Sequence, residues 1–357
     1  MENAHYRLRD FLHALPNGYP STDSGIEIRI LEKIFSKEEA SLLPNLRMKF
    51  ETAESISQRT GIDAGYLKIM LPIMSDKGQL FGVSFGDVSL YKALPFVFGI
   101  YEFQVRRIDS ELAGLCDEYF KEAFGKEFFG RSPALMKVIP IGIDMKENTS
   151  IEPYESVASL IEGAKAWAVN DCICKKEKML NGKQCEKPME VCLAFAPVEH
   201  IFDDGKSGRP ITKEDAYRIL KISEEAGLVH MTSNVRSGHF YICNCCKCCC
   251  GPLSNYIATS KNAAAKSSFT AAVDAGLCTS CGTCAERCQA DAVEIADHAV
   301  IEDCIGCGLC VSTCPSGAIS MVRREKEDTL PVPENEKEWM EMRARDRGIG
   351  DGYKKLL

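Results

Sequence analysis

Two segments in the C-terminal part of the sequence share one cysteine spacing, and this repeat constrains the fold more than any other feature. They are Cys278–Ala292 and Cys304–Ala318, whose first cysteines lie 26 residues apart, and each reads C-x₂-C-x₂-C-x₃-C. This spacing holds a [4Fe–4S] cubane, because one tight loop supplies three thiolates and the fourth cysteine opens the next segment. Gly282, Gly306 and Gly308 let the backbone of these loops pass close to such a cluster.

Residues 269–322 resemble the bacterial two-cluster ferredoxin domain. The resemblance implies two [4Fe–4S] clusters, each held by three cysteines of one run and the last cysteine of the other. The implied ligands are Cys278, Cys281, Cys284 and Cys314 for the first cluster and Cys304, Cys307, Cys310 and Cys288 for the second. Gln289 stands where this family usually has proline, which concerns the start of a helix rather than a ligand. Zinc is the alternative, and eight cysteines in a doubled order disfavour it.

Ten further cysteines lie between residues 172 and 250. The candidate metal ligands are a subset of Cys172, Cys174, Cys185, Cys192, Cys243, Cys245, Cys246, Cys248, Cys249 and Cys250. So many thiols exceed the needs of core packing and would be open to oxidation without a metal. We predict one or two additional [4Fe–4S] clusters here. The alternatives are a structural zinc ion on the first four of these cysteines and an unusual, catalytically active iron–sulfur centre.

The order of the middle cysteines also predicts how they meet. Adjacent cysteines seldom share one tetrahedral site, so Cys245 and Cys246, and likewise residues 248–250, are expected to divide between a ligand set and packing or a second site. A helix that begins with a capping box at Thr212 is expected to return the chain, so that residues 243–250 face the first four cysteines. We predict one metal-bearing unit, with two independent sites as the alternative.

Residues 25–92 predict a winged-helix-like domain, since helices and a helix–turn–helix around Gly61 precede a β-hairpin. Charge argues against DNA binding, because residues 25–84 carry eight basic and eight acidic side chains. The candidate recognition helix, Asp63–Met74, has Lys68 as its single basic residue, whereas DNA affinity depends on clustered Lys and Arg. We expect a scaffold or docking role, and DNA binding is the less favoured hypothesis.

The fold class expected from these segments is α+β and multidomain. The expected domains are an N-terminal arm (1–24), a winged-helix-like domain (25–92), a helical connector (93–150), a cysteine-rich metal-binding domain (151–268), a two-cluster ferredoxin domain of βαβ type (269–322) and a charged tail (323–357). Residues 153–169 are expected to be helical, and residues 260–268 to form a linker. Over residues 25–322 this order is similar to that of poorly characterised 4Fe–4S ferredoxin proteins of anaerobes, a group that brings no established substrate.

Composition favours a globular protein in a reducing compartment. Of 357 residues, 45% are hydrophobic and 26% charged, and the formal net charge of −8 disfavours a general polyanion-binding surface. Residues 1–20 lack the apolar core of a signal peptide, and no apolar stretch is long enough to span a membrane. We therefore expect a cytoplasmic protein without a membrane span, in which the thiols stay reduced.

Electron transfer is the function that these features favour. The sequence contains no dinucleotide or phosphate-binding glycine motif and no nucleophile elbow that would indicate a substrate site. We predict an electron-transfer subunit of an oxidoreductase system. Residues 274–320 carry seven acids against Arg287 alone, which favours a redox partner with a basic docking patch. The alternatives are a redox sensor that regulates transcription through the winged helix, and an enzyme subunit with its active centre among the middle cysteines.

Overall fold

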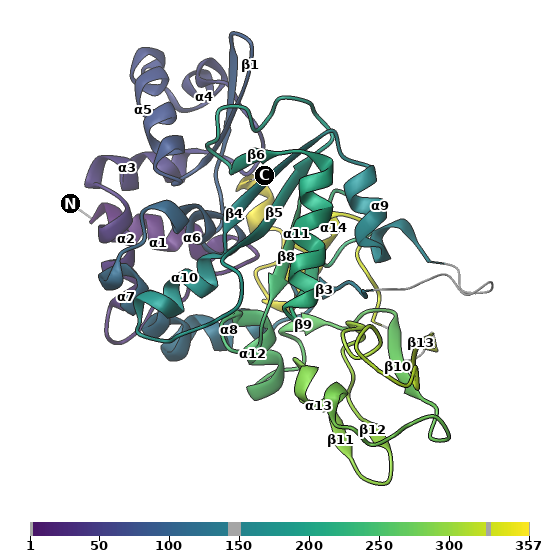
Figure 1. Ribbon diagram of the computed structural model, residues 1–357. Coiled ribbons are helices and arrows are strands. Elements are labelled where there is room, and N and C mark those ends of the chain that lie inside the picture. The colour runs from purple at the N-terminus through teal and green to yellow at the C-terminus, as the bar shows by residue number, and fades with distance from the viewer. Residues whose placement is uncertain (1–2, 142–150, 326–329, 357) are drawn as a thin grey trace. The chain divides into compact units, whose positions relative to one another are not determined.

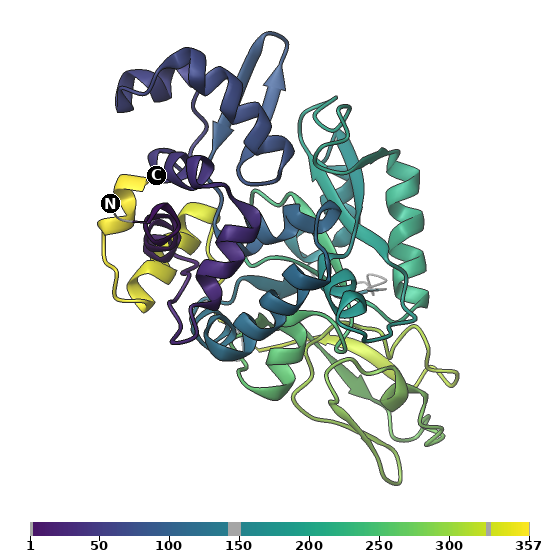
Figure 2. The same cartoon turned by 90° about the vertical axis from the view of Figure 1, so that its left-hand side faces the viewer.

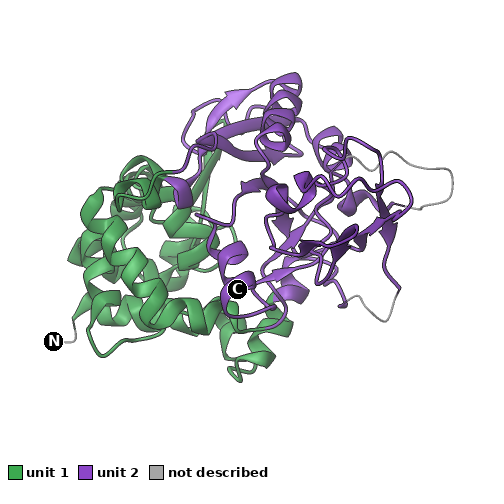
Figure 3. Ribbon diagram, turned by 60° about the horizontal axis from the view of Figure 1, so that its bottom comes forward, with its two compact units in different colours: residues 1–131, 176–184, 340–357 green, residues 132–175, 185–339 purple. Residues whose placement is uncertain are grey.

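The computed structural model mixes helices with strands, as the α+β class requires. It describes residues 3–141, 151–325 and 330–356. The chain divides into two compact units (Figure 3). The first comprises residues 1–131, 176–184 and 340–357, and the second comprises residues 132–175 and 185–339. The finer domain boundaries given above stay predictions.

The first unit is mainly helical. Its described elements are α1 (Ala4–Ala14), α2 (Ile26–Ile34), α3 (Lys37–Leu42), α4 (Ala53–Thr60), α5 (Ala64–Asp76), β1 (Phe81–Phe85), β2 (Val88–Lys92), α6 (Tyr101–Phe103), α7 (Ser110–Tyr119) and α8 (Gly125–Phe129). Ser36 and Glu39 form a capping box at the start of α3, and Gly61 ends α4 in the left-handed conformation that glycine adopts readily. Strands β1 and β2 pair as an antiparallel hairpin. A winged-helix fold for these elements stays a prediction.

Aromatic rings fill the core of the first unit. Tyr19, Phe96, Tyr119 and Phe124 are all buried, and their ring centroids approach to between 4.8 and 6.2 Å. Rings at such separations interact beyond the area that they bury. The C-terminal segment lies beside α1 (Figure 2), where the guanidinium of Arg347 donates a hydrogen bond to the carbonyl of Leu15 over 2.5 Å. The two ends of the chain are therefore tied together within this unit.

A mixed sheet organises the second unit. In the described residues it has seven strands in the order β6-β4-β5-β8-β7-β3-β9. Neighbouring strands are antiparallel, except that β3 and β9 are parallel. The strands are β3 (Met136–Val138), β4 (Ala166–Asp171), β5 (Glu190–Ala196), β6 (Arg209–Ile211), β7 (Val229–Ser233), β8 (Tyr241–Cys245) and β9 (Ala264–Ala265).

Helices flank this sheet and connect its strands. They are α9 (Val157–Glu162), α11 (Lys213–Glu225), α12 (Gly251–Ala258) and the start of α10 (Ile173–Leu180), whose residues from 176 on belong to the first unit. Helix α11 begins with the capping box of Thr212 and Asp215, as the sequence predicts, and packs on β4 and β5 (Figure 1). Helix α10 follows β4 directly, and α12 follows the turn after β8. The middle cysteines therefore lie within β5 and β8, in the first turn of α10, and in the loops that adjoin β4, β5 and β8.

Part of the sheet replaces a helix that the sequence predicts. Residues 153–169 form a 3₁₀ turn and α9 and then enter β4, so the expected continuous helix is wrong. Helix α9 ends at Gly163, and Trp167 pairs with residues of β5 and β6, which gives the backbone of this segment hydrogen-bond partners in the sheet. Residues 260–268, expected as a linker, contribute strand β9 and the buried Ser267.

The C-terminal part of the second unit carries both cysteine runs. Its described elements are β10 (Phe269–Val273), α13 (Thr283–Arg287), β11 (Val293–Ile295), β12 (Ala299–Ile301) and β13 (Ile319–Arg323). Helix α14 (Glu336–Asp346) follows, and its residues from 340 on belong to the first unit. Strand β10 pairs with β13 and β11 pairs with β12, and both pairs are antiparallel. Helix α13 lies between β10 and β11 in the chain, and a short turn joins β11 to β12. A ferredoxin-like fold of βαβ type for these elements stays a prediction. Among the described residues, no helix has the length and apolarity to cross a membrane.

Candidate metal centres

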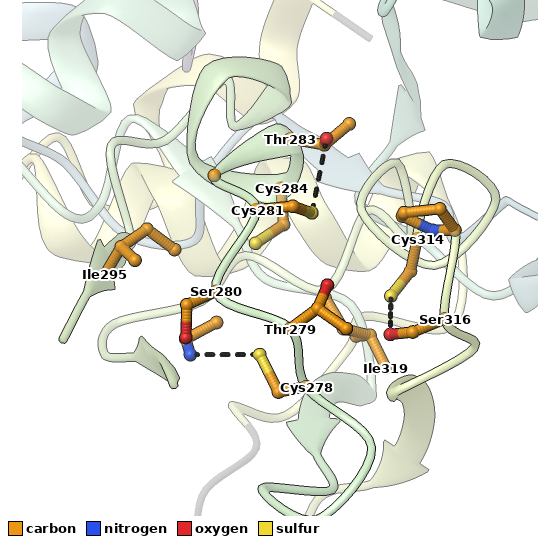
Figure 4. Close-up of a pocket in the computed structure, with 13 residues that line it drawn as sticks. Cys278, Thr279, Ser280, Cys281, Thr283, Cys284, Ile295, Cys314, Ser316 and Ile319 are labelled. Carbon is orange, nitrogen blue, oxygen red and sulfur yellow. Dashed lines mark hydrogen bonds between the residues drawn. The ribbon is translucent and has the colours of Figure 1, made fainter. Parts of the chain in front are cut away.

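The first ferredoxin-type cysteine set surrounds one pocket. Cys278, Cys281 and Cys284 lie in the loop before α13 and in its first turn, and Cys314 lies in the loop before β13 (Figure 4). All four line the same cavity, together with residues that include Ile295 of β11. Cys281 is exposed and Cys284 is buried, so this pocket lies at the surface of the unit. The fold thus brings the last cysteine of the second run to the first run.

Hydrogen bonds reach the sulfur atoms of both ferredoxin-type sets. The backbone N–H of Ala299 donates to Sγ of Cys278 over 3.4 Å, and that of Gly306 donates to Sγ of Cys304 over 3.3 Å. Cys288 accepts a similar N–H···S bond over 3.3 Å. Such bonds stabilise thiolate charge and help to set the reduction potential of an iron–sulfur cluster. The donor set of these loops therefore fits anionic, metal-bound sulfur.

The second ferredoxin-type set is more deeply buried. Cys307 and Cys310 are buried, and both interact electrostatically with Cys304 and Cys288. Burial raises the pKa of Cys307, and it raises the pKa of Cys310 to about 12. A buried thiol of this kind does not ionise on its own near neutral pH, but a bound cation stabilises its thiolate. This set therefore also fits a metal centre.

Two glycines hold the second loop close to its neighbours. Gly306 has a φ of +74°, and a Cβ there would lie 2.1 Å from the carbonyl oxygen of Phe269. At Gly308 the φ is +79°, and a Cβ would lie 2.5 Å from the carbonyl oxygen of Ile141. The N–H of Ile141 also donates to the carbonyl of Cys307 over 2.9 Å. No residue with a side chain fits these two positions without a shift of backbone.

The middle cysteines separate into two groups, of which the first is compact. We call this first group the four-thiol group, and its members are Cys185, Cys246, Cys248 and Cys249. Their Sγ atoms all lie within 4.8 Å of one another. Cys185 lies in the loop between α10 and β5, and the other three lie in the turn after β8. The structure therefore brings one of the first four middle cysteines to the later run.

The turn after β8 explains why neighbouring cysteines meet in one group. The N–H groups of Cys249 and Cys250 both donate to the carbonyl of Cys246, over 3.3 and 3.0 Å. This tight turn brings the thiols of Cys248 and Cys249 together, 3.7 Å apart. Cys248 and Cys249 therefore lie in one group, whereas Cys250 lies in the other, and Cys245 and Cys246 also fall in different groups. How these cysteines divide among ligand sites stays a prediction.

The remaining middle cysteines form a second group. We call it the six-thiol group, and its members are Cys172, Cys174, Cys192, Cys243, Cys245 and Cys250. Side-chain contacts connect Cys192 to Cys243, Cys243 to Cys245, and Cys245 to Cys250. Cys172 contacts Cys174 and interacts electrostatically with Cys243, Cys245 and Cys250. The hydrogen bond with Cys174 is the main cause that lowers the pKa of Cys172 to about 7.

A buried lysine that the sequence analysis missed acts on both middle groups. Lys175 is 1% exposed, and its Nζ donates to the carbonyl of Pro188 over 2.7 Å. The pKa of Cys246 is lowered to about 5, first by hydrogen bonding with Cys249 and also by the positive charge of Lys175. The same charge lowers the pKa of Cys172. The feature of the sequence that could have indicated this role is the position of Lys175 directly after the C-x-C pair.

Polar contacts join residues that flank Cys288 and Cys304 of the second ferredoxin-type set to the segment that carries the later middle cysteines. The side-chain oxygen of Gln289 accepts the N–H of Lys247 over 3.0 Å, and Lys247 forms an ion pair with Asp291. From α12, the hydroxyl of Tyr256 donates to Asp303 over 3.3 Å. Gln289, which departs from the pattern of the resembled family, thus has a role in packing. The residues that flank the second set lie against the segment that carries the later middle cysteines.

Comparison with known proteins supports one part of this arrangement. Residues 300–320 match the family described as a 4Fe-4S binding domain. The match covers the second cysteine run and the start of β13. No curated protein and no solved structure matches the chain. The chain therefore carries a segment of the 4Fe–4S-binding type, in a cysteine-rich setting.

Proposed function

We propose that this protein transfers electrons through iron–sulfur clusters held by its two ferredoxin-type cysteine sets. One observation carries the proposal: Cys314 of the second run completes the pocket formed by three cysteines of the first run. This exchange of the last cysteine is what the resemblance to a two-cluster ferredoxin implies, and the match of residues 300–320 supports 4Fe–4S binding by the second run. Bound [4Fe–4S] clusters would supply one-electron redox chemistry at these positions.

The environments of the two sets support different roles. The first set includes the exposed Cys281, whereas Cys307 and Cys310 of the second set are buried. Exposure suits a site that exchanges electrons with a partner protein. Burial, and the contacts of Gln289 and Tyr256 described above, suit a site that exchanges electrons with a centre in the middle segment. We therefore assign the first set to contact with a partner and the second to an internal position.

The surface around the first set supports a basic redox partner. The exposed acids of this segment, apart from those paired with lysines, are Asp274, Glu286, Glu294, Asp297 and Glu302. Between them lie two exposed apolar side chains, Leu277 at 53% and Ile295 at 38%. An acidic rim steers a partner of opposite charge, and apolar groups strengthen the contact once it forms. We propose that the partner docks here, with an association rate that falls as salt rises.

We further propose one [4Fe–4S] cluster on the six-thiol group. Four ligands are needed and six thiols are available, connected by pairwise contacts and electrostatic interactions. Unlike the four-thiol group, they include no three whose Sγ atoms all lie within 4.8 Å of one another. Cys172 accepts a backbone hydrogen bond from Lys175, and Cys250 accepts one from Leu253. These two backbone N–H···S hydrogen bonds match those that the ferredoxin-type sets receive. This group also precedes α12, which contacts Asp303 beside the second set.

Charge in the first unit supports a docking domain in place of a DNA-binding one. Lys68, the basic residue of α5, forms an ion pair with Glu54 at 2.7 Å. The same helix exposes Ile69 by 64% and Ile73 by 41%. A helix that reads DNA presents cations to phosphates, whereas exposed apolar side chains suit contact with a protein. We expect no gel shift with genomic fragments at low salt, in either the reduced or the oxidised protein.

Replacement of a ligand in each set tests the proposed function. Cys281→Ala and Cys307→Ala should each lower iron by about four atoms per chain in anaerobically purified protein, because each removes one cubane ligand. Electron paramagnetic resonance of each reduced variant should lose the signal of the one cluster whose ligand is replaced. Cys116→Ser, which alters a buried thiol of α7 in the first unit, is the control and should keep all iron. Wild-type protein with almost no iron or labile sulfide would overturn the proposal.

A further inference from the structure

We propose that the four-thiol group is a mononuclear zinc site, separate from the iron–sulfur sites. The observation behind it is the closeness of the sulfur atoms. The Sγ separations are 3.9 Å for Cys185–Cys246, 3.7 Å for Cys185–Cys248, 3.3 Å for Cys246–Cys248 and 3.7 Å for Cys248–Cys249. Every pair in the group lies within 4.8 Å.

These separations fit one metal ion and not a cubane. Zinc bound to four thiolates at about 2.3 Å places the sulfur atoms about 3.8 Å apart, along the edges of a tetrahedron. In a [4Fe–4S] cluster each thiolate binds a different iron, so the four ligand sulfurs stand roughly 6 Å apart. Among the residues that the structure describes, the four-thiol group is the one set of metal-ligating side chains with all ligand atoms within 4.8 Å. The ferredoxin-type sets do not share this compactness.

The chemistry of the ligands selects zinc. Four thiolates close the coordination shell, which is typical of structural zinc, and soft sulfur ligands favour zinc over hard cations such as magnesium. Four thiolates around a divalent ion leave excess negative charge. The ammonium of Lys175 is buried nearby and acts on the charge of Cys246, which offsets part of that excess. The site is therefore suited to thiolates bound to a dication.

The position of the group in the fold gives the ion a structural role. Cys246 and Cys249 are buried in the core between the sheet and α11, and Cys185 packs against the same core. The loop that carries Cys185 crosses to this core without regular secondary structure, and Lys187 on it donates to the carbonyl of Ala226 over 2.6 Å. An ion bound here would hold this loop to the turn after β8. Its binding energy would then contribute to the stability of the folded middle segment.

Metal analysis of the full-length protein tests the proposal. Protein purified anaerobically in buffer with a chelator should contain one zinc per chain, and zinc X-ray absorption should show four sulfur neighbours at about 2.3 Å. Cys248→Ser alters the exposed member of the group and Cys185→Ser alters the loop member. Each should reduce zinc to well below half an atom per chain and leave iron unchanged. Cys116→Ser should retain both metals.

Three results would overturn the zinc site. They are wild-type protein without zinc, a Cys248→Ser variant that loses iron in place of zinc, and a spectrum of mononuclear iron that disappears in that variant. If both serine variants fail to fold, the X-ray absorption of the wild-type protein decides the question. Zinc and iron are counted separately, so a failure of the zinc site is distinguishable from a failure of the proposed electron transfer.

Discussion

The two cysteine-rich regions of the second unit differ in how their sulfur atoms are spaced. The first ferredoxin-type set surrounds a pocket, and both sets receive backbone N–H···S hydrogen bonds, as at Cys278 and Cys304. The four-thiol group is compact, with sulfur atoms in contact with one another, as Cys246 and Cys248 are at 3.3 Å. The number of cysteines is the same in each set, so the number alone does not identify the metal. The separation of the ligand atoms distinguishes a cluster from a single ion.

Exposure to air should give the largest difference between the two regions in how much metal they retain. Iron–sulfur clusters oxidise, whereas zinc has no redox chemistry in proteins. We expect most of the iron to be lost over a time course in which zinc stays at one per chain. Loss should begin at the first ferredoxin-type set, because Cys281 is exposed and Cys307 is buried. Metal analysis at intervals, with electron paramagnetic resonance, measures both rates. Parallel loss of zinc and iron would contradict the distinction.

A matched pair of glycine variants should give the next largest effect. Both Gly306 and Gly282 have positive φ, but a Cβ at Gly306 would meet the backbone of Phe269 at 2.1 Å, whereas a Cβ at Gly282 meets nothing within 4 Å. Gly282→Ala should cost about 1 kcal/mol from backbone strain alone. Gly306→Ala should cost several kcal/mol and lower iron by about four atoms per chain, because the loop of the second set must shift.

Thermal unfolding and iron analysis of both glycine variants check this prediction, and zinc should be unchanged in each. Equal effects of the two substitutions would show that the close approach at Gly306 does not hold the second loop. Loss of zinc in Gly306→Ala would show that the four-thiol group depends on the structure of the second ferredoxin-type loop.

The grouping of Cys278, Cys281, Cys284 and Cys314 around one pocket could be predicted from the sequence, because most of these proposed ligands are local in the chain. Three cysteines of each run lie on one loop, and the resemblance supplies the exchange of Cys314 and Cys288. The middle site could not be predicted in this way, because its grouping depends on which strands pair. Cys185 meets the later run only because β5 pairs with β8, and residues 153–169 show no alternation that indicates the neighbouring strand β4.

Two further features of the middle cysteines depend on the folded structure: the turn that contains Cys248 and Cys249, and the burial of Lys175. The sequence does not indicate that the thiols of Cys248 and Cys249 lie close together, because this depends on the turn closed by hydrogen bonds to Cys246. Lys175 was missed because a lysine beside cysteines is ordinary on a surface, and only the structure shows that this one is buried. Spacing predicts ligands within a loop, whereas tertiary structure determines ligands from different strands.

Substitution of Lys175 should give the smallest effect. Lys175→Met removes a positive charge near Cys172, so the proposed cluster on the six-thiol group becomes harder to reduce. We expect its reduction potential to fall by on the order of tens of millivolts, while the potentials of the ferredoxin-type clusters change less. Lys183→Met, which alters an exposed lysine, is the control and should change none of them. Redox titration with electron paramagnetic resonance measures the shift. An unchanged set of potentials would show that Lys175 does not face a redox centre.

Native mass spectrometry of the anaerobic, full-length protein tests the central claim most directly, because it weighs every bound metal and sulfide on one chain. We expect a principal species with at least two [4Fe–4S] clusters and one zinc ion, and a third cluster if the six-thiol group is filled. Cys248→Ser should lack only the zinc, and Cys307→Ala should lack only one cluster. A principal species that carries zinc without any iron–sulfur cluster, or clusters without zinc, would contradict the division of the cysteines between the two kinds of centre.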